Sequence, residues 1–164
     1  MRFFDTMETS VGILRIEENN GYITRIGIFE PGQNNDAMPH VVHPLITQCK
    51  QQLQEYFSGE RAEFTVPIRP FGTDYSQSVW EKLKTVNYGE TITYKELATR
   101  MGTPTAQRAV AGANRRNPIM IILPCHRVIG ANGAMTGYAG GGIKNKEWLI
   151  EHEKKHREKL LPLK

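Results

Sequence analysis

The chain has 164 residues, of which 39% are hydrophobic and 23% are charged, a composition typical of a soluble globular protein with one ordinary domain or two small ones. No run approaches the roughly 20 apolar residues that a membrane-spanning helix needs, which excludes an integral membrane protein of that kind. Residues 1–82 carry 7 Lys and Arg against 11 Asp and Glu, a net charge of −4, whereas residues 83–164 carry 14 against 6, a net charge of +8. The basic half predicts a polyanionic partner, although an unevenly charged solvated surface would give the same numbers.

The first third of the chain predicts a small sheet. Residues 11–16 and 22–29 are rich in β-branched and aromatic side chains, and the Asn-Asn-Gly at 19–21 tolerates positive φ, which predicts a β-hairpin. Residues 30–39 are polar, so we expect a loop there. The first five residues lack the extended apolar core of a signal peptide, and we expect the protein in the cytoplasm.

A helix is predicted after this loop. Apolar residues recur at helical spacing from Leu45 to Phe57, and a Ser-Gly pair ends the run. Cys49 lies on the apolar face, where we expect a small buried hydrophobe. The other cysteine is Cys125, and without a signal peptide we expect no disulfide between the two. Their spacing fits no zinc-finger pattern, so we expect no metal site and no cofactor.

A domain boundary is predicted where two prolines and a glycine fall between Pro67 and Thr73. We therefore divide the chain into an N-terminal domain over residues 1–70 and a C-terminal domain over residues 71–164. Short helices are predicted beyond the boundary, and the first of them carries one apolar stripe: Val79, Trp80 and Leu83.

Two further short helices are predicted to form a helix-turn-helix. Thr93 and Glu96 fit a capping box at the start of the first helix, which ends near Gly102. The second helix covers residues 107–116, and the Asn-Pro at 117–118 closes it.

The second of these helices has an unusual surface for a packed element. It is built largely from Ala and Gly, and its long side chains are mostly polar or basic. Small residues let a helix approach any partner closely, including a neighbouring core helix. Three cations on and beside it, Arg108, Arg115 and Arg116, favour DNA as the partner.

The reactive candidate follows a buried run. Residues 119–123 are all apolar, which predicts a buried strand or extended segment. They lead into Pro124-Cys125-His126-Arg127-Val128, which puts a thiol beside an imidazole and a guanidinium. A free thiol has a pKa near ~8.5, so reactivity requires nearby positive charge or a base, and His126 is the candidate base.

The residues downstream complete this candidate site. Asn132-Gly133 predicts a tight turn, and residues 137–142 form a Gly-rich loop whose single aromatic, Tyr138, could pack on a flat ligand. The same loop fits a plain linker into the last helix, which Trp148, Leu149 and His152 mark. Glu153 fits an exposed helix carboxylate by its pattern, or a third group that orients His126.

Taken together, these segments resemble the O6-alkylguanine-DNA alkyltransferases (methylated-DNA–protein-cysteine methyltransferases). The resemblance is close over about residues 72–155 and looser in the N-terminal part. The run from Pro124 to Val128 carries it, together with the following segments: Leu53–Gly59, Gln77–Trp80, Tyr88-Gly89, Thr93-Tyr94, Arg108–Val110, Asn117-Pro118, Gly137–Gly141 and Lys146–Leu149.

The resemblance implies a fold and a reaction. The expected fold is α/β (α+β): a small RNase H-like N-terminal domain followed by a mainly helical, winged-helix-like C-terminal domain with the helix-turn-helix. The expected reaction is direct reversal of DNA alkylation, in which the alkyl group of O6-alkylguanine, and of O4-alkylthymine, moves irreversibly to the protein's own cysteine. The thioether product is stable, so each molecule acts once.

The resemblance also implies roles for individual residues. Cys125 is the expected alkyl acceptor, His126 the base that acts through a water, and Glu153 the carboxylate that holds the histidine. Asn117 braces the turn between the recognition helix and the active site, and Tyr94 crowds the target phosphate and contacts the guanine edge. Because guanine should not leave as an anion, we also expect a proton donor, and Tyr94 is the candidate.

DNA contacts and a base pocket are implied in the same way. The recognition helix enters the minor groove of double-stranded DNA, and Arg108 fills the gap that the extruded nucleotide leaves. The expected DNA-binding residues are Arg108, Tyr94, Gln107, Ala109, Ala111, Gly112, Arg115 and Arg116. The expected pocket residues are Val128, Tyr138, Ala139, Met135 and Asn114. Two of these depart from some family members, which have serine at 139 and an apolar residue at 114.

Partners and alternatives follow from these expectations. We expect a monomer that binds damaged DNA and no membrane. One alternative is a non-catalytic damage reader, but such relatives lack the cysteine that this chain has at 125. Another is a cysteine hydrolase that uses Cys125 and His126, for which the sequence offers no evident amide or ester pocket.

Overall fold

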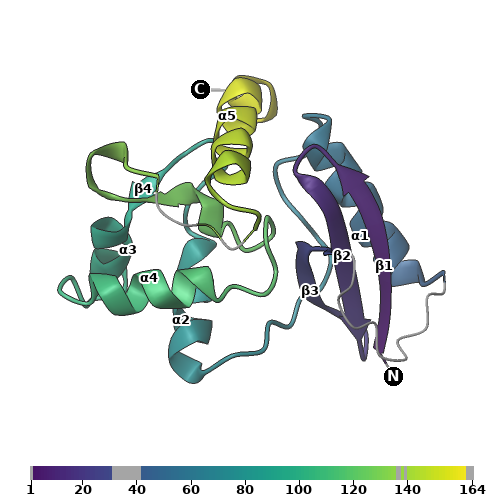
Figure 1. Cartoon of the computed structure of the whole chain (residues 1–164), viewed down its shortest axis with the longest axis horizontal. Coiled ribbons are helices and arrows are strands. Elements are labelled where there is room, and N and C mark those ends of the chain that lie inside the picture. The colour runs from purple at the N-terminus through teal and green to yellow at the C-terminus, as the bar shows by residue number, and fades with distance from the viewer. Residues whose placement is uncertain (1, 31–41, 136–137, 139, 162–164) are drawn as a thin grey trace.

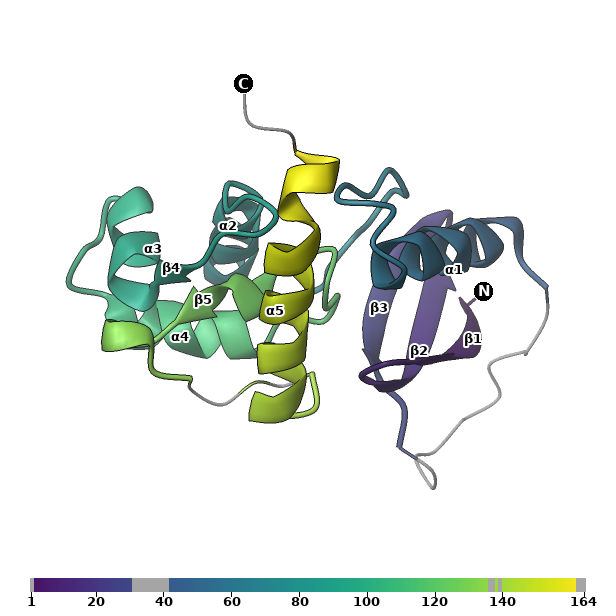
Figure 2. The ribbon, with the colours of Figure 1, turned by 90° about the horizontal axis from the view of Figure 1, so that it is seen from above.

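The computed structural model describes residues 2–30, 42–135, 138 and 140–161. A small sheet with one helix on its face forms the N-terminal part, and a cluster of short helices forms the C-terminal part (Figure 1). The last helix, α5 (Ile143–Leu160), runs between the two parts (Figure 2). The expected fold class is confirmed, since a mixed α/β N-terminal domain precedes a helical domain.

The N-terminal sheet has three antiparallel strands in the order β1-β2-β3: Arg2–Thr9, Gly12–Asn19 and Tyr22–Ile28. The hairpin predicted from the turn at 19–21 is confirmed, with Asn19 opposite Tyr22. The sequence did not predict β1. Only two of its eight side chains, Phe4 and Met7, are buried, so the strand has no period-two pattern of apolar residues.

The helix α1 (Pro44–Phe57) packs across this sheet, as its spacing predicted. Proline stands in its first turn, where the missing N–H is tolerated, and the ring nitrogen Nδ1 of His43 accepts from the Leu45 amide at 3.2 Å. Cys49 is fully buried on the face toward the sheet, as expected. The loop predicted over 30–39 lies outside the described residues apart from Glu30.

The C-terminal domain begins with α2 (Asp74–Leu83), whose predicted apolar stripe is buried. The predicted helix-turn-helix is confirmed as α3 (Tyr94–Arg100) and α4 (Gln107–Arg115). The Thr93 hydroxyl caps α3 by accepting from the Glu96 amide at 3.1 Å. The Trp80 indole donates to the Ala113 carbonyl at 2.9 Å and so fixes α2 against α4.

The apolar run at 119–123 is buried for the most part, but it is not a strand. Only Ile119 forms a bridge, to Ile26 of β3, and the chain then turns, because the Leu123 amide donates back to the Ile119 carbonyl at 3.1 Å. Ile121 adopts φ +74° within this turn. Residues 119–123 are all apolar because they pack between the two domains, and this pattern does not indicate whether their backbone is extended.

Three short elements link this turn to α5. The Cys-His-Arg segment forms a 3₁₀ turn, η1 (Cys125–Arg127), and continues into β5 (Val128–Ile129), which pairs in parallel with β4 (Ile92–Thr93). The predicted Asn-Gly turn is confirmed inside η2 (Ala131–Gly133), with both residues at positive φ. Within the described chain no helix is long and apolar enough to cross a membrane.

Candidate active site

Cys125 is presented by two tight turns in succession. Its amide donates to the Leu123 carbonyl at 2.8 Å across Pro124, whose φ of −81° and ψ of 62° are those of an inverse γ-turn. Its own carbonyl accepts from the Asn114 side-chain amide of α4 at 3.2 Å. The residue is 4% exposed. The sulfur is therefore held in place by backbone geometry.

Asn117 braces this arrangement through three bonds. Its Nδ2 donates to the Leu123 carbonyl at 2.7 Å and contacts the Cys125 sulfur at 3.1 Å, and its Oδ1 accepts from the Ile119 amide at 2.9 Å. The amide is thus locked with its N–H groups toward the thiol. An N–H donor at this place stabilises the thiolate more than the thiol.

The groups around Cys125, taken together, nevertheless keep its thiol protonated. Burial raises the pKa of Cys125, while the Asn117 amide and the Lys146 ammonium oppose that shift without cancelling it. Lys146 belongs to α5 and is 1% exposed. Cys125 is therefore a neutral thiol at rest, and its sulfur can act as a nucleophile only when a base removes the proton.

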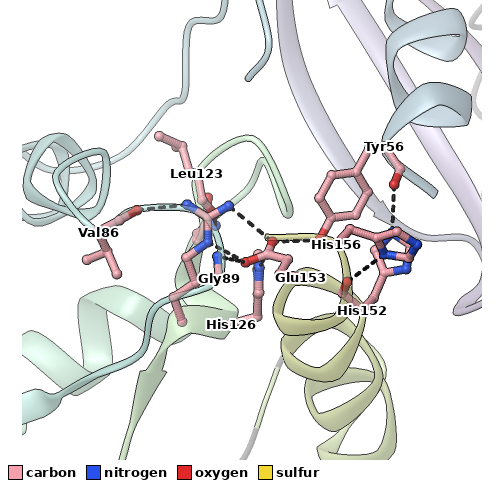
Figure 3. Close-up of polar contacts among 10 residues, drawn as sticks. Tyr56, Val86, Gly89, Leu123, His126, His152, Glu153 and His156 are labelled. Atoms are coloured by element: carbon pink, nitrogen blue, oxygen red, sulfur yellow. Dashed lines mark hydrogen bonds and ion pairs between the residues drawn. The ribbon is translucent and has the colours of Figure 1, made fainter. Parts of the chain in front are cut away.

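A buried carboxylate on α5, that of Glu153, forms the centre of a polar network (Figure 3). Glu153 Oε2 lies 2.7 Å from His126 Nε2 and accepts from the Tyr56 hydroxyl at 2.7 Å. Arg127 donates to both oxygens, at 2.7 Å from Nε and 3.0 Å from Nη2, and the Gly89 amide donates to Oε1 at 3.4 Å. Donors from three separate parts of the chain, two of them side-chain and one backbone, thus converge on one carboxylate.

These hydrogen-bond donors keep Glu153 ionised. Burial alone would raise the pKa of the carboxyl, but His126 and Arg127 outweigh that effect and hold its pKa far below the ordinary value. An ionised carboxylate can only accept hydrogen bonds, so His126 must carry its proton on Nε2. The other ring nitrogen, Nδ1, then has a free lone pair whenever the ring is neutral.

The histidine is suited to accept a proton. Burial lowers the pKa of His126 below 6.5, and the attraction of Glu153 does not fully compensate. Its Nδ1 is buried and has no hydrogen-bond partner among the described residues. At neutral pH the site therefore combines a protonated Cys125 thiol with a neutral His126 imidazole, whose Nδ1 is able to accept a proton.

Cys125 lines a cavity of about 310 Å³, the lower end of the size range of ligand sites. Arg115 and Arg116 from the end of α4 line it together with Arg25 of β3. The edge of the N-terminal sheet thus forms one wall of the space in front of the thiol. Of the predicted base-pocket residues within the described chain, none lines this cavity.

The residues predicted to contact DNA lie mostly on the outer face of the helix-turn-helix. The exposed ones are Gln107, Arg108, Ala109, Arg115 and Arg116, whereas Ala111 and Gly112 are half-buried. Val110 and Ala113 turn inward to the core, so one face of α4 stays free. Tyr94, at the start of α3, is half-buried, and the Lys146 ammonium lies 5.7 Å from its ring.

The residues predicted to form the base pocket are placed unevenly. Val128, Tyr138 and Asn114 are buried, Met135 is half-buried, and Ala139 lies outside the described residues. Gly140 makes room for the Tyr138 ring, because a Cβ at Gly140 would come within 2.5 Å of it. The loop is held by Asn145, which donates to the Gly140 carbonyl at 2.9 Å.

Three residues of the site were not assigned from the sequence. The cation that acts on the thiol is Lys146, and the guanidinium of Arg127, which adjoins the thiol in sequence, is bound to Glu153 and to the Val86 carbonyl. Tyr56 reaches the site from α1, 97 residues away from Glu153. A motif shows neighbours in sequence and not side-chain direction, so no local signal pointed to these contacts.

Metal binding has no support in the described part of the chain. Nowhere in it do three or more His, Cys, Asp or Glu side chains gather closely enough to hold a metal ion.

Two family models match the chain and together cover most of it. The ribonuclease-like domain of 6-O-methylguanine DNA methyltransferase matches residues 3–70. The DNA binding domain of 6-O-methylguanine DNA methyltransferase matches residues 74–155.

Curated relatives and solved structures agree with these models. The constitutive methylated-DNA–protein-cysteine methyltransferase of Bacillus subtilis (strain 168) is 42% identical over 162 residues, which cover 94% of this chain and 96% of the relative. A crystal structure of the Mycobacterium tuberculosis O6-methylguanine methyltransferase has a TM-score of 0.84 at 41% identity and covers 95% of this chain and 94% of its own. A crystal structure of Mycobacterium tuberculosis OGT in complex with DNA has a TM-score of 0.84 at 42% identity, over 94% of both chains.

Replacing Glu153 with Gln should destabilise the fold by about 3–5 kcal/mol, because Arg127 is left as an uncompensated buried charge. In the wild type, the pKa of Glu153 is lower in the folded state than in the unfolded state, where it is near 4.5. Glu153 therefore stabilises the fold at pH values above about 4.5, and this contribution declines as the pH falls below that value. Urea unfolding at several pH values should therefore show a shallower acid loss in Glu153→Gln. Glu151→Gln, an exposed change on the same helix, should stay within about 0.5 kcal/mol of wild type. Equal acid slopes in wild type and Glu153→Gln would contradict the assignment of an ionised Glu153.

Proposed function

The chain belongs to the 6-O-methylguanine DNA methyltransferase family, and on this premise we propose that Cys125 is its alkyl acceptor. The protein repairs alkylated DNA by transferring the alkyl group to a cysteine. The proposal assigns that cysteine, its base and its DNA-binding surface.

The choice between the two cysteines rests on the cavity. Cys49 is fully buried in the core face of α1, and burial raises its pKa to about 12. Cys125 lines a cavity and contacts an amide N–H that stabilises the thiolate. Cys125 is therefore the sulfur that a substrate can reach, and this observation carries the proposal.

Transfer is an in-line displacement at a saturated carbon. The Cys125 sulfur forms a bond to the alkyl carbon while the bond from that carbon to O6 of guanine breaks, and the electron pair remains on the purine. The thiol proton passes to His126 Nδ1 through a bridging water, for which a buried, unpartnered nitrogen is a suitable site. Tyr94 supplies a proton to the purine, so that guanine leaves neutral. The thioether that results is stable, and each molecule acts once.

The substrate is O6-alkylguanine, and O4-alkylthymine as a second base, in double-stranded DNA. The free face of α4 is built from small residues, which suits the minor groove of about 6 Å width. Arg108 is exposed in the first turn of α4, and its side chain fills the gap in the base stack when the nucleotide is extruded. Arg115 and Arg116 neutralise phosphates near the cavity. We expect the protein to act as a monomer in the cytoplasm.

Cys125→Ser should abolish alkyl transfer, because a serine hydroxyl is a far weaker nucleophile at neutral pH than a thiol. The measurement is the intact mass of the protein after incubation with an oligonucleotide that carries O6-methylguanine. The wild type should gain one methylene, and peptide mapping should place it on Cys125. Cys49→Ala is the matched control and should gain the same mass. Binding of the oligonucleotide should remain nearly intact in Cys125→Ser, and alkylation of Cys49 in the wild type would overturn the assignment.

Arg108→Ala should slow repair of duplex DNA more than reaction with free O6-benzylguanine, because only the duplex substrate requires nucleotide extrusion. If Arg108 only contacted a phosphate, its loss would reduce the slope of log affinity against log salt concentration by about one. It would not change the rate of either chemical reaction. Rates for both substrates should be measured at saturating protein. Equal slowing of the two reactions would show that Arg108 has no part in extrusion.

A further inference from the structure

We propose that Tyr56 of the N-terminal domain is a positioning residue for alkyl transfer, because its hydroxyl holds the Glu153 oxygen that orients the histidine base. The inference rests on the proposed roles of Cys125 and His126. It gives the ribonuclease-like domain a part in the chemistry of the other domain.

The contact is direct and fully buried. The Tyr56 hydroxyl donates to Glu153 Oε2 at 2.7 Å, and His126 Nε2 lies 2.7 Å from the same oxygen. Tyr56 is 0% exposed and Glu153 is 1% exposed. Two donors from different domains therefore share one carboxylate oxygen, as the labelled side chains show (Figure 3).

Tyr56 is fixed at both its backbone and its hydroxyl. His152 Nε2 donates to the Tyr56 carbonyl at 2.7 Å, so consecutive residues of α5 bind the two ends of this one residue. Its ring packs edge-on against Tyr88, with centroids 6.2 Å apart, and beside Phe64 at 5.8 Å. The hydroxyl therefore has little freedom to leave the carboxylate.

The hydroxyl can only donate to this carboxylate. Burial, followed by the charge of Glu153, raises the pKa of Tyr56 well above its ordinary value, so the phenol keeps its proton at any pH that the protein meets. With two donors from Arg127, one from His126 and one from Gly89, the carboxylate is saturated. Such saturation fixes the plane of the carboxylate and, through it, the orientation of the imidazole.

The same contact tunes the base. A donor on Oε2 withdraws negative charge from the oxygen that accepts from His126, and so weakens the stabilisation of the imidazolium. The other groups that face His126 are Arg127 of η1 and Lys146 of α5, both of which lower its pKa. Removing the tyrosine hydroxyl leaves these two in place and should raise the pKa of His126.

Tyr88 provides a matched control in the same surroundings. It is 4% exposed, and burial and the charge of Glu153 raise its pKa to about 12, yet its hydroxyl has no hydrogen-bond partner among the described residues. Tyr88→Phe thus removes the same atom from the same cluster without removing a bond to the carboxylate.

The experiment compares Tyr56→Phe, Tyr88→Phe and wild type with O6-benzylguanine over a range of pH. Each molecule reacts once, so the final alkylated fraction by intact mass counts the folded, active molecules and separates them from the rate constant. Tyr56→Phe should react about three- to tenfold more slowly per active molecule, the range that corresponds to the loss of one ordinary hydrogen bond. The acid limb of its pH–rate profile should move to higher pH, because a more basic His126 becomes protonated at a higher pH as the solution is acidified. Tyr88→Phe should match the wild type in both respects.

Several outcomes would overturn the inference. One is that Tyr56→Phe has the same rate constant and the same acid limb of the pH–rate profile as the wild type. Another is that Tyr56→Phe reacts more slowly but keeps the wild-type acid limb, because that result indicates an effect on packing alone. A shift of the limb to lower pH, or equal shifts in Tyr88→Phe, would contradict it as well. If the wild type itself gained no mass on Cys125, the proposed function would fail first, and the two failures are thereby distinguished.

Discussion

The structure depends on one buried negative charge. Glu153 is 1% exposed, and an ionised carboxylate at such a position destabilises a fold unless donors surround it. Here the donors come from α1, from the turn before β4 and from η1, so the helix α5 can pack only when all three are in place. Glu153 therefore links α1 of the sheet domain to the Gly89 turn and to η1 of the helical domain, and the same charge orients His126, the proposed base.

Burial keeps the Cys125 sulfur protonated in the free protein. The Cys125 thiol is protonated at rest, and the neutral His126 imidazole is available to accept its proton. A thiolate that persisted in the free protein would be open to oxidation and to other electrophiles, whereas a thiol activated on demand is spent on its substrate. Under the proposal that Cys125 is the alkyl acceptor and reacts once, a Cys125 sulfur that is lost to another electrophile is also lost to repair.

Local patterns predicted much of the fold. The hairpin at 19–21, the helix α1 and the helix-turn-helix were all predictable, because turn residues, helical periodicity and caps act over a few residues. The strand β1 gives no period-two signal because few of its side chains are buried. The apolar run at 119–123 predicts burial correctly but not the turn that the chain makes there, because such a run indicates burial and not conformation. In the site, the Cys-His pair was evident, but the contact from Tyr56 to Glu153 spans 97 residues and leaves no trace in either local pattern.

The central claim is that an ionised Glu153 holds His126 as a neutral imidazole with its proton on Nε2, which leaves Nδ1 without a hydrogen-bond partner among the described residues. Heteronuclear NMR of the His126 ring nitrogens tests it most directly. At neutral pH the account predicts a protonated Nε2 and an unprotonated Nδ1, and a change to imidazolium only below the ordinary histidine pKa of about 6.5. A proton on Nδ1, or an imidazolium already present at neutral pH, would contradict the account.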